Sequence, residues 1–156
     1  MVDHHDHQAP PRAVPAGNAG YLEKITQAVF QSGFSWAVIR QKWPHFQSAF
    51  ADFDVGAVAS FNDEDVERLL EDKGIVRNGR KIEATIHNAR ICRDLIARHG
   101  SFYNYLRTLD GLTYEARARQ LSQQFKFLGP TGVYFFLYSV GEEVPPYEAW
   151  RAAQGA

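Results

Sequence analysis

The sequence lacks the features that define disulfide-bonded, membrane-spanning and secreted proteins. It has one cysteine, Cys92, which excludes an internal disulfide and any metal site built from several cysteines. It has no apolar run long enough to cross a bilayer, and no charged-then-apolar signal segment is recognisable at its start. We therefore expect a soluble protein of a reducing compartment, the cytoplasm.

An excess of charge of one sign is also missing. The 17 Lys and Arg side chains nearly balance 18 Asp and Glu side chains, and the formal net charge is −1. Any nucleic-acid role must therefore rest on a local basic patch, because the chain as a whole does not attract a polyanion. What the chain does have is apolar material, with 45% hydrophobic and 13% aromatic residues, which is enough for the core of one domain.

The two ends of the chain differ in composition from the middle. Residues 1–18 are rich in His, Pro and Ala without an apolar period, which predicts a mobile N-terminal tail. Its cluster His4, His5, Asp6 and His7 is either a polar terminus or a metal site, and the first is favoured because ordering a tail opposes metal binding. We expect one helical domain over residues 19–150 and a C-terminal tail over 151–156.

Helical periodicity dominates from Gly20 onward, and no segment indicates a strand or a repeat. Gly33 is placed to end a first helix, Ser35 to cap the next, and Pro44 to begin another. Further helices are predicted after Asp54, from about Asp63 with Leu69 and Leu70 buried, from about Gly79 to His99, after Ser101 and after Thr113. The sequence therefore predicts an all-α fold.

The segment KFLGPTGVYFFLYSVG predicts a tight turn between two helices. Its glycines allow a ligand to approach the backbone, and the N–H groups of Gly132 and Val133 would open a helix at the positive end of its dipole. Such a turn fits a DNA phosphate, with Lys126, Arg117 and Arg119 adding positive charge. A plain connection between two helices gives the same pattern, so spacing alone leaves both interpretations open.

Three stretches resemble, in this order, the Tag-type 3-methyladenine DNA glycosylases of the helix-hairpin-helix superfamily: SGFSWAVIRQKWPHFQSAFADFD, DEDVERLLEDKGIVRNGRKIEATIHNAR and FKFLGPTGVYFFLYSVG. The resemblance spans about Tyr21 to Gly141 and implies an all-α, two-lobed fold with the hairpin at about residues 113–140. It also implies hydrolysis of the N-glycosidic bond of an alkylated purine, such as 3-methyladenine, in the base-excision repair of double-stranded DNA. We expect a monomer that needs no cofactor.

The resemblance assigns roles to single residues. Trp36 matches the aromatic residue that stacks on the flipped base, and Gln31 and Ser35 belong to the same base-binding segment. Trp43, by contrast, is expected to serve packing. Contacts to DNA phosphates are implied for the hairpin and for the basic residue after the GIVR turn, namely Lys126, Gly129, Thr131, Gly132, Val133 and Lys81.

The sequence departs from the family pattern at the base-reading position. Ala28 stands eight residues before Trp36, where the family has the Glu that hydrogen-bonds the methylated adenine. Glu23 does not replace it, because five residues along a helix turn a side chain by about 140° around the axis. The remaining candidates for a catalytic carboxylate are Glu142 and Glu143, since other branches of the superfamily place an Asp beyond the hairpin. Acidic residues after a helix are also often simply solvated.

The sequence departs from the family at its zinc ligands as well. The Cys-containing N-terminal segment of the family is missing, and GEEVPPYEAW stands where the family's other Cys/His ligands lie. We therefore expect no bound metal.

Three functions stay open on the sequence alone. The chain is an active alkyl-base glycosylase, a relative that binds lesions without cleaving them, or a helical domain with another partner. A cavity with Trp36 and no Glu can retain activity on cationic bases, since stacking contributes about 1–3 kcal/mol per base. The first function predicts that Trp36 faces an open cavity, with the hairpin amides on the same surface.

Overall fold

The computed structural model describes residues 12–154, so the cluster His4 to His7 lies outside the described part. No strand occurs among the described residues. The helices follow in the order α1 (Asn18–Gln31), α2 (Trp36–Ala49), the 3-10 turn η2 (Ala51–Phe53), α3 (Val55–Ala59), α4 (Asp63–Leu70), α5 (Gly79–His99), α6 (Phe102–Arg107), α7 (Tyr114–Gln124), α8 (Pro130–Ser139) and α9 (Tyr147–Gln154).

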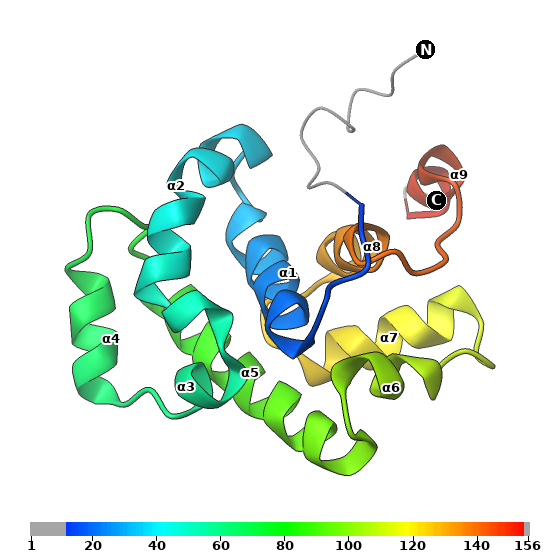
Figure 1. Ribbon diagram of the computed structural model, residues 1–156. Coiled ribbons are helices and arrows are strands. Elements are labelled where there is room, and N and C mark those ends of the chain that lie inside the picture. The colour runs from blue at the N-terminus through cyan, green and yellow to red at the C-terminus, as the bar shows by residue number, and fades with distance from the viewer. Residues whose placement is uncertain (1–11, 155–156) are drawn as a thin grey trace.

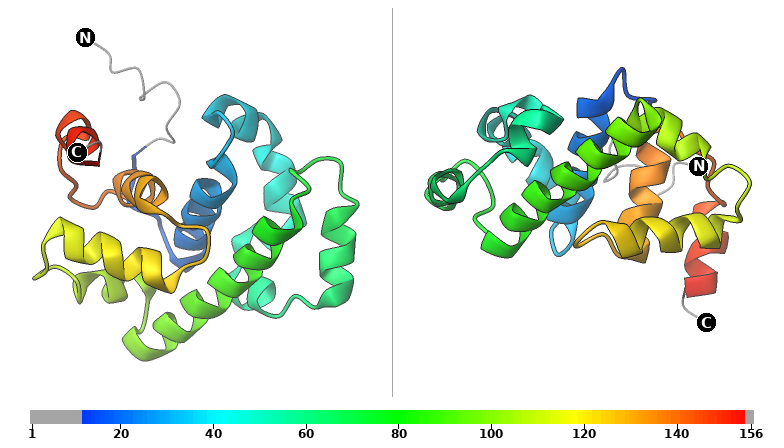
Figure 2. Two further views of the ribbon diagram at one scale, coloured as in Figure 1. Left: turned by 180° about the vertical axis from the view of Figure 1, so that it is seen from behind. Right: turned by 90° about the horizontal axis from the view of Figure 1, so that it is seen from below.

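Two helices, α1 and α5, form the centre of the molecule and the others gather on either side of them (Figure 1). The long helix α5 packs against α1, α3, α4 and α6, while α1 also packs against α2 and α8. Helices α2 to α4 lie on one side of this pair and α6 to α9 on the other, as both further views show (Figure 2). The fold is therefore all-α and two-lobed. None of the helices in the described part combines the length and apolarity needed to cross a membrane.

Local signals set most helix ends where the sequence predicts them. The side chain of Ser35 accepts the N–H of Val38, and that of Thr113 accepts the N–H of Ala116. Helix α5 spans the predicted residues, and Gly100 ends it with φ +89°, a left-handed conformation that suits glycine. The hairpin helices α7 and α8 lie within the expected range 113–140.

The predicted helix start at Pro44 is wrong, because α2 runs through this residue without interruption. A proline inside a helix removes one backbone hydrogen bond. Packing around the neighbouring Trp43 offsets that loss. The Trp43 ring stacks on Phe46 and Phe53, with centroids 4.8 and 5.3 Å apart, and its Nε1 donates to Glu23 Oε2 at 2.8 Å. Trp43 thus serves packing, as expected.

The burial predicted for α4 is correct at one of its two leucines. Leu69 is buried, whereas Leu70, the last residue of the helix, is 41% exposed.

Residues 12–17, part of the segment expected to form the N-terminal tail, lie against the end of α8. The Arg12 guanidinium donates to the carbonyls of Tyr138 and Glu142, each at 2.9 Å. The N–H of Ala13 donates to the carbonyl of Ser139, also at 2.9 Å. At the other terminus α9 extends to Gln154, into the segment assigned to the C-terminal tail.

We predict that Glu23→Ala lowers the free energy of unfolding by about 1–3 kcal/mol, because it leaves the buried Trp43 indole N–H without its acceptor. The same carboxylate oxygen also accepts Gln47 Nε2 at 2.9 Å. Urea unfolding followed by circular dichroism measures the change. The control is Glu67→Ala, an exposed site on α4, which should stay within about 0.5 kcal/mol. Equal midpoints for the two variants would contradict the role given to Glu23.

Candidate base-binding cavity and hairpin

A cavity of about 480 Å³ lies between the end of α1 and the turn that joins α7 to α8. Its volume falls within the range of pockets that bind small molecules. None of its described lining residues carries an ionisable side chain, so its chemistry is that of aromatic rings, amides, hydroxyls and backbone N–H groups. These residues are Ala28, Gln31, Ser32, Gly33 and Phe34 on one wall, and Phe127, Gly129, Pro130, Thr131, Gly132 and Phe135 on the other.

The hairpin wall presents the start of α8. Gly129 precedes the helix, and Pro130 is its first residue. The N–H of Val133 donates to the carbonyl of Gly129 at 2.9 Å, so the expectation that this amide is free is wrong. The amides of Thr131 and Gly132 precede that first intrahelical bond and have no acceptor within the helix. These two N–H groups are therefore the available anion donors of the hairpin.

Lys81 on α5 supports the opposite wall. Its Nζ donates to the carbonyl of Ser32 at 2.6 Å and lies 5.5 Å from the centroid of the Phe34 ring. The side chain is 7% exposed, and burial lowers the pKa of its ammonium. In this structure the ammonium holds the turn after α1, whereas the family resemblance implies a contact to DNA phosphate.

Asn88, also on α5, supports the hairpin wall. It is fully buried, its Nδ2 donates to the carbonyl of Lys126 at 3.0 Å, and its Oδ1 accepts the N–H of Lys126 at 2.8 Å. The next residue, Phe127, has φ +58° and is 50% exposed. This left-handed backbone costs an L-residue about 1–2 kcal/mol. The two side-chain bonds fix the peptides on either side of Lys126, the second of which precedes Phe127.

The cavity includes four of the predicted site residues, Gln31, Gly129, Thr131 and Gly132. The structure places Trp36 elsewhere. Trp36 is 5% exposed, belongs to the hydrophobic core and is not among the residues that line this cavity. The reason is the helix start, because Ser35 caps α2 and Trp36 then shares the buried face of α2 with Ile39 and Trp43.

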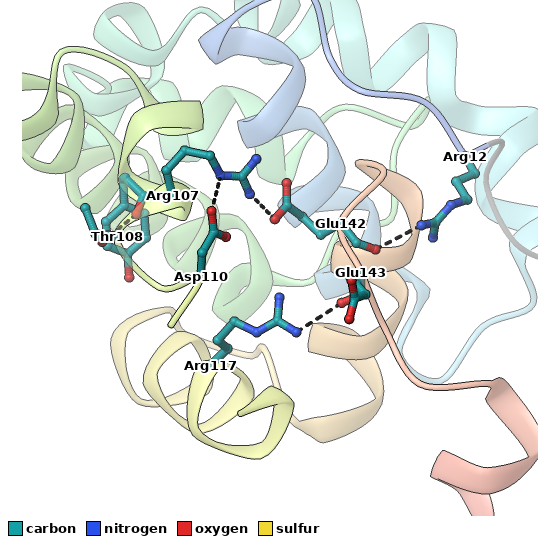
Figure 3. Close-up of polar contacts among 8 residues, drawn as sticks. Arg12, Arg107, Thr108, Asp110, Arg117, Glu142 and Glu143 are labelled. Carbon is teal, nitrogen blue, oxygen red and sulfur yellow. Dashed lines mark hydrogen bonds and ion pairs between the residues drawn. The ribbon is translucent and has the colours of Figure 1, made fainter. Parts of the chain in front are cut away.

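Two further groups of predicted residues lie outside this cavity. Lys126 is exposed and lines a separate cavity with His87 and Arg90. Glu142 and Glu143 line a third cavity, at the far end of α8 (Figure 3).

The carboxylate of Glu142 forms an ion pair with Arg107. Glu142 is 7% exposed and binds Arg107, whose Nε lies 3.1 Å from Asp110 Oδ2 (Figure 3). Arg117 donates to the backbone carbonyl of Glu143 at 3.2 Å. The structure thus gives Glu142 a structural partner and brings neither glutamate to the wall beside the hairpin amides.

The same region does not provide the zinc ligands that the family resemblance implies. Arginine guanidinium groups, which do not ligate zinc, surround Glu142. Within residues 12–154 no three His, Cys, Asp or Glu side chains come together as a metal site would require. No step of the chemistry is therefore assigned to a metal.

Sequence reasoning missed the aromatic residues of the cavity. Phe34 is 43% exposed and Phe127 is 50% exposed, and the partly buried Phe135 lies beside them in the wall. Phe34 and Phe127 stand within the turns GFS and KFLGP, where no buried helix face is expected. The sequence signal that could have identified them is a large apolar residue inside a glycine-containing turn.

The all-helical fold and the cavity beside a Gly-Pro hairpin define a helix-hairpin-helix protein of the DNA glycosylase type. The family profile described as methyladenine glycosylase matches residues 1–143. This chain belongs to that family.

Individual relatives agree with this assignment. The chain is similar to DNA-3-methyladenine glycosylase 1 of Escherichia coli (strain K12), with 31% identity over 130 residues that cover 71% of this chain and 70% of that protein. It is 28% identical to the DNA-3-methyladenine glycosylase of Haemophilus influenzae over 139 residues, 77% of this chain and 75% of that protein. The solved structure of 3-methyladenine DNA glycosylase I from Staphylococcus aureus matches with a TM-score of 0.75 at 26% identity, over 90% of this chain and 87% of that chain.

We predict that Lys81→Met lowers the free energy of unfolding by about 1–3 kcal/mol, because the Ser32 carbonyl loses its charged donor. Thermal unfolding followed by circular dichroism measures the loss. The control is Arg80→Met, which removes an exposed charge from the adjacent position. If Lys81→Met melts like Arg80→Met, the ammonium does not hold the turn.

Proposed function

We propose that this protein is a base-excision repair glycosylase that hydrolyses the N-glycosidic bond of an alkylated purine, such as 3-methyladenine, in double-stranded DNA. It acts in the cytoplasm as a monomer. The observation that carries the proposal is the cavity between α1 and the α7–α8 hairpin in a member of the methyladenine glycosylase family.

The hairpin supplies the contact to DNA in this proposal. The amides of Thr131 and Gly132 lie at the positive end of the α8 dipole and bind a backbone phosphate. Lys126, an exposed residue three positions before Gly129, adds positive charge to the segment that leads into the hairpin. Phosphate contacts of this kind position DNA without reading its sequence, which suits an enzyme that must act anywhere in a genome.

The cavity then takes the extruded base. Extrusion from the duplex costs a few kcal/mol, which stacking and edge hydrogen bonds must offset. Aromatic rings supply about 1–3 kcal/mol per base, and a cationic base gains more over a ring face. The side-chain amide of Gln31 and the hydroxyls of Ser32 and Thr131 are the polar side-chain groups in the walls that can bond to a base edge.

The chemistry asked of the protein is small for a cationic base. A 3-methylated adenine carries positive charge while it is attached to the sugar, so its glycosidic bond is already weakened. When that bond breaks, the bonding electron pair moves to the base and neutralises it, and water adds to the cationic sugar carbon and releases one proton to the surrounding water. The walls therefore need to hold the base, and they act without a carboxylate.

A second function is favoured by one specific residue. Ala28, at the position of the family's base-reading Glu, lines the cavity and is 9% exposed. An apolar methyl group gives less discrimination than an edge hydrogen bond. In the second function the protein holds alkylated sites in DNA without releasing the base.

We predict that the protein releases free 3-methyladenine from DNA treated with a methylating agent, measured by chromatography of the released bases. Gly129→Asp should lower duplex binding and base release by roughly 10- to 150-fold, because the new carboxylate caps the amides that bind phosphate. A side chain fits there, since an added Cβ meets nothing within 4 Å.

The matched control is Gly111→Asp, which adds the same charge at a second open position, in the α6–α7 connection. It should bind and cleave like the unchanged protein. Binding to alkylated DNA without release of base would support the second function. Unchanged binding by Gly129→Asp would remove the hairpin from the DNA interface.

We predict that Ala28→Glu raises the affinity for free 3-methyladenine by roughly 10- to 150-fold, because a carboxylate in the wall accepts a hydrogen bond from the base edge. Isothermal titration with the free base measures the change. The control is Ser32→Glu, which places the same charge on an exposed part of the wall. If both variants bind alike, charge in the region, rather than the Ala28 position, controls the affinity.

A further inference from the structure

Four non-glycine residues in the described part of the chain have left-handed backbone conformations, and they fall into two groups. Ala51, Asp52 and Phe53 form one turn after α2. That turn places the Phe53 ring in the core, where it is 1% exposed and stacks on Trp43 and Phe50, with centroids 5.3 and 5.7 Å apart. Burial of an aromatic ring thus offsets the backbone strain in the first group.

The second group is Phe127 alone, and burial of its ring does not offset the strain of its backbone as it does at Phe53. Its φ is +58°, as unfavourable as that of Phe53, but its ring is 50% exposed and lines the cavity. Burial of apolar area therefore contributes far less here than at Phe53. Strained residues persist where the surrounding structure holds them, and they cluster at binding sites.

Asn88 is the group that holds Phe127 in this conformation. Both polar atoms of its side chain bond to the single residue Lys126. Nδ2 donates to the Lys126 carbonyl at 3.0 Å, and Oδ1 accepts the Lys126 N–H at 2.8 Å. Asn88 is fully buried on α5, a long helix packed against α1 and α3, so the peptide before Phe127 cannot relax independently. The ring is thereby presented to the cavity before any ligand arrives.

We propose that Phe127 is the stacking surface for the extruded base, and that Asn88 is its positioning residue. The proposal rests on the proposed function and assigns to Phe127 the part that the family resemblance gives to Trp36, whose ring is in the core. A base stacked on Phe127 covers the exposed face of the ring. The bound state therefore gains the burial that the free protein lacks.

The test is a titration of free 3-methyladenine, which measures the base contact without DNA. Phe127→Leu should weaken binding by roughly 5- to 150-fold, the equivalent of one stacking contact. Phe127→Tyr retains a stacking face and should bind close to the unchanged protein. The control is Tyr103→Leu, which removes another exposed ring, on α6, and should have no effect. Normal binding by Phe127→Leu would overturn the proposal.

The role of Asn88 is tested by coupling. Asn88→Ala should weaken base binding, and the double variant Asn88→Ala with Phe127→Leu should bind no more weakly than Phe127→Leu alone. Additive losses would show that Asn88 acts independently of Phe127 and would overturn its positioning role. Thermal unfolding of each variant separates this coupling from a general loss of the fold. A general loss would lower the unfolding temperature of every variant that contains Asn88→Ala, whichever residue stands at position 127.

Failure of this inference is distinguishable from failure of the proposed function. If the unchanged protein binds and releases 3-methyladenine and Phe127→Leu does the same while Trp36→Phe does not, the stacking assignment alone is overturned. If the unchanged protein neither binds the free base nor releases it from methylated DNA, both proposals are overturned.

Discussion

The two walls of the cavity depend on two polar side chains from one helix. Lys81 and Asn88 lie seven residues apart on α5, two helical turns, and so project from nearly the same face. One donates to the carbonyl of Ser32 and the other bonds twice to Lys126. The distance between the turn at Ser32 and the turn at Lys126 is therefore set by the regular geometry of α5. Since α5 also packs against α1, α3 and α6, any shift of the walls would require movement of the centre of the molecule.

This dependence explains which parts of the structure the sequence predicts. Helix ends follow from local chemistry, so the caps at Ser35 and Thr113 and the stop at Gly100 are visible in the residue order. The residue order does not reveal that α2 continues through Pro44, because the cause is the packing of Trp43 with partners on η2 and α1. The acceptor of Lys81 lies 49 residues away in the chain, so a basic residue that holds a turn looks the same in the sequence as one that binds DNA.

The candidate site shows the same division. The hairpin residues Gly129, Thr131 and Gly132 line the cavity, and the sequence indicates them because a helix start leaves its first N–H groups without intrahelical acceptors. Trp36 was expected in the cavity on the strength of resemblance, yet its position on α2 gives it a core face. Phe127 has no periodic pattern to reveal it, since it lies in a turn whose preceding residue, Lys126, is held by two bonds from Asn88, 39 positions before Phe127. Family membership thus defines the fold more closely than it defines the base contacts.

The contact between Arg12 and the end of α8 affects the order in which parts of the protein unfold. Arg12 bonds to Tyr138 and Glu142, which lie 126 and 130 positions later in the chain. These are the largest sequence separations of any side-chain hydrogen bond among the described residues. Its bonds are exposed or only partly buried, and the helices beneath it pack without it. Segments of this kind open at a small fraction of the global unfolding free energy. We therefore expect residues 12–17 to detach, and their amide protons to exchange, while the helical core stays folded.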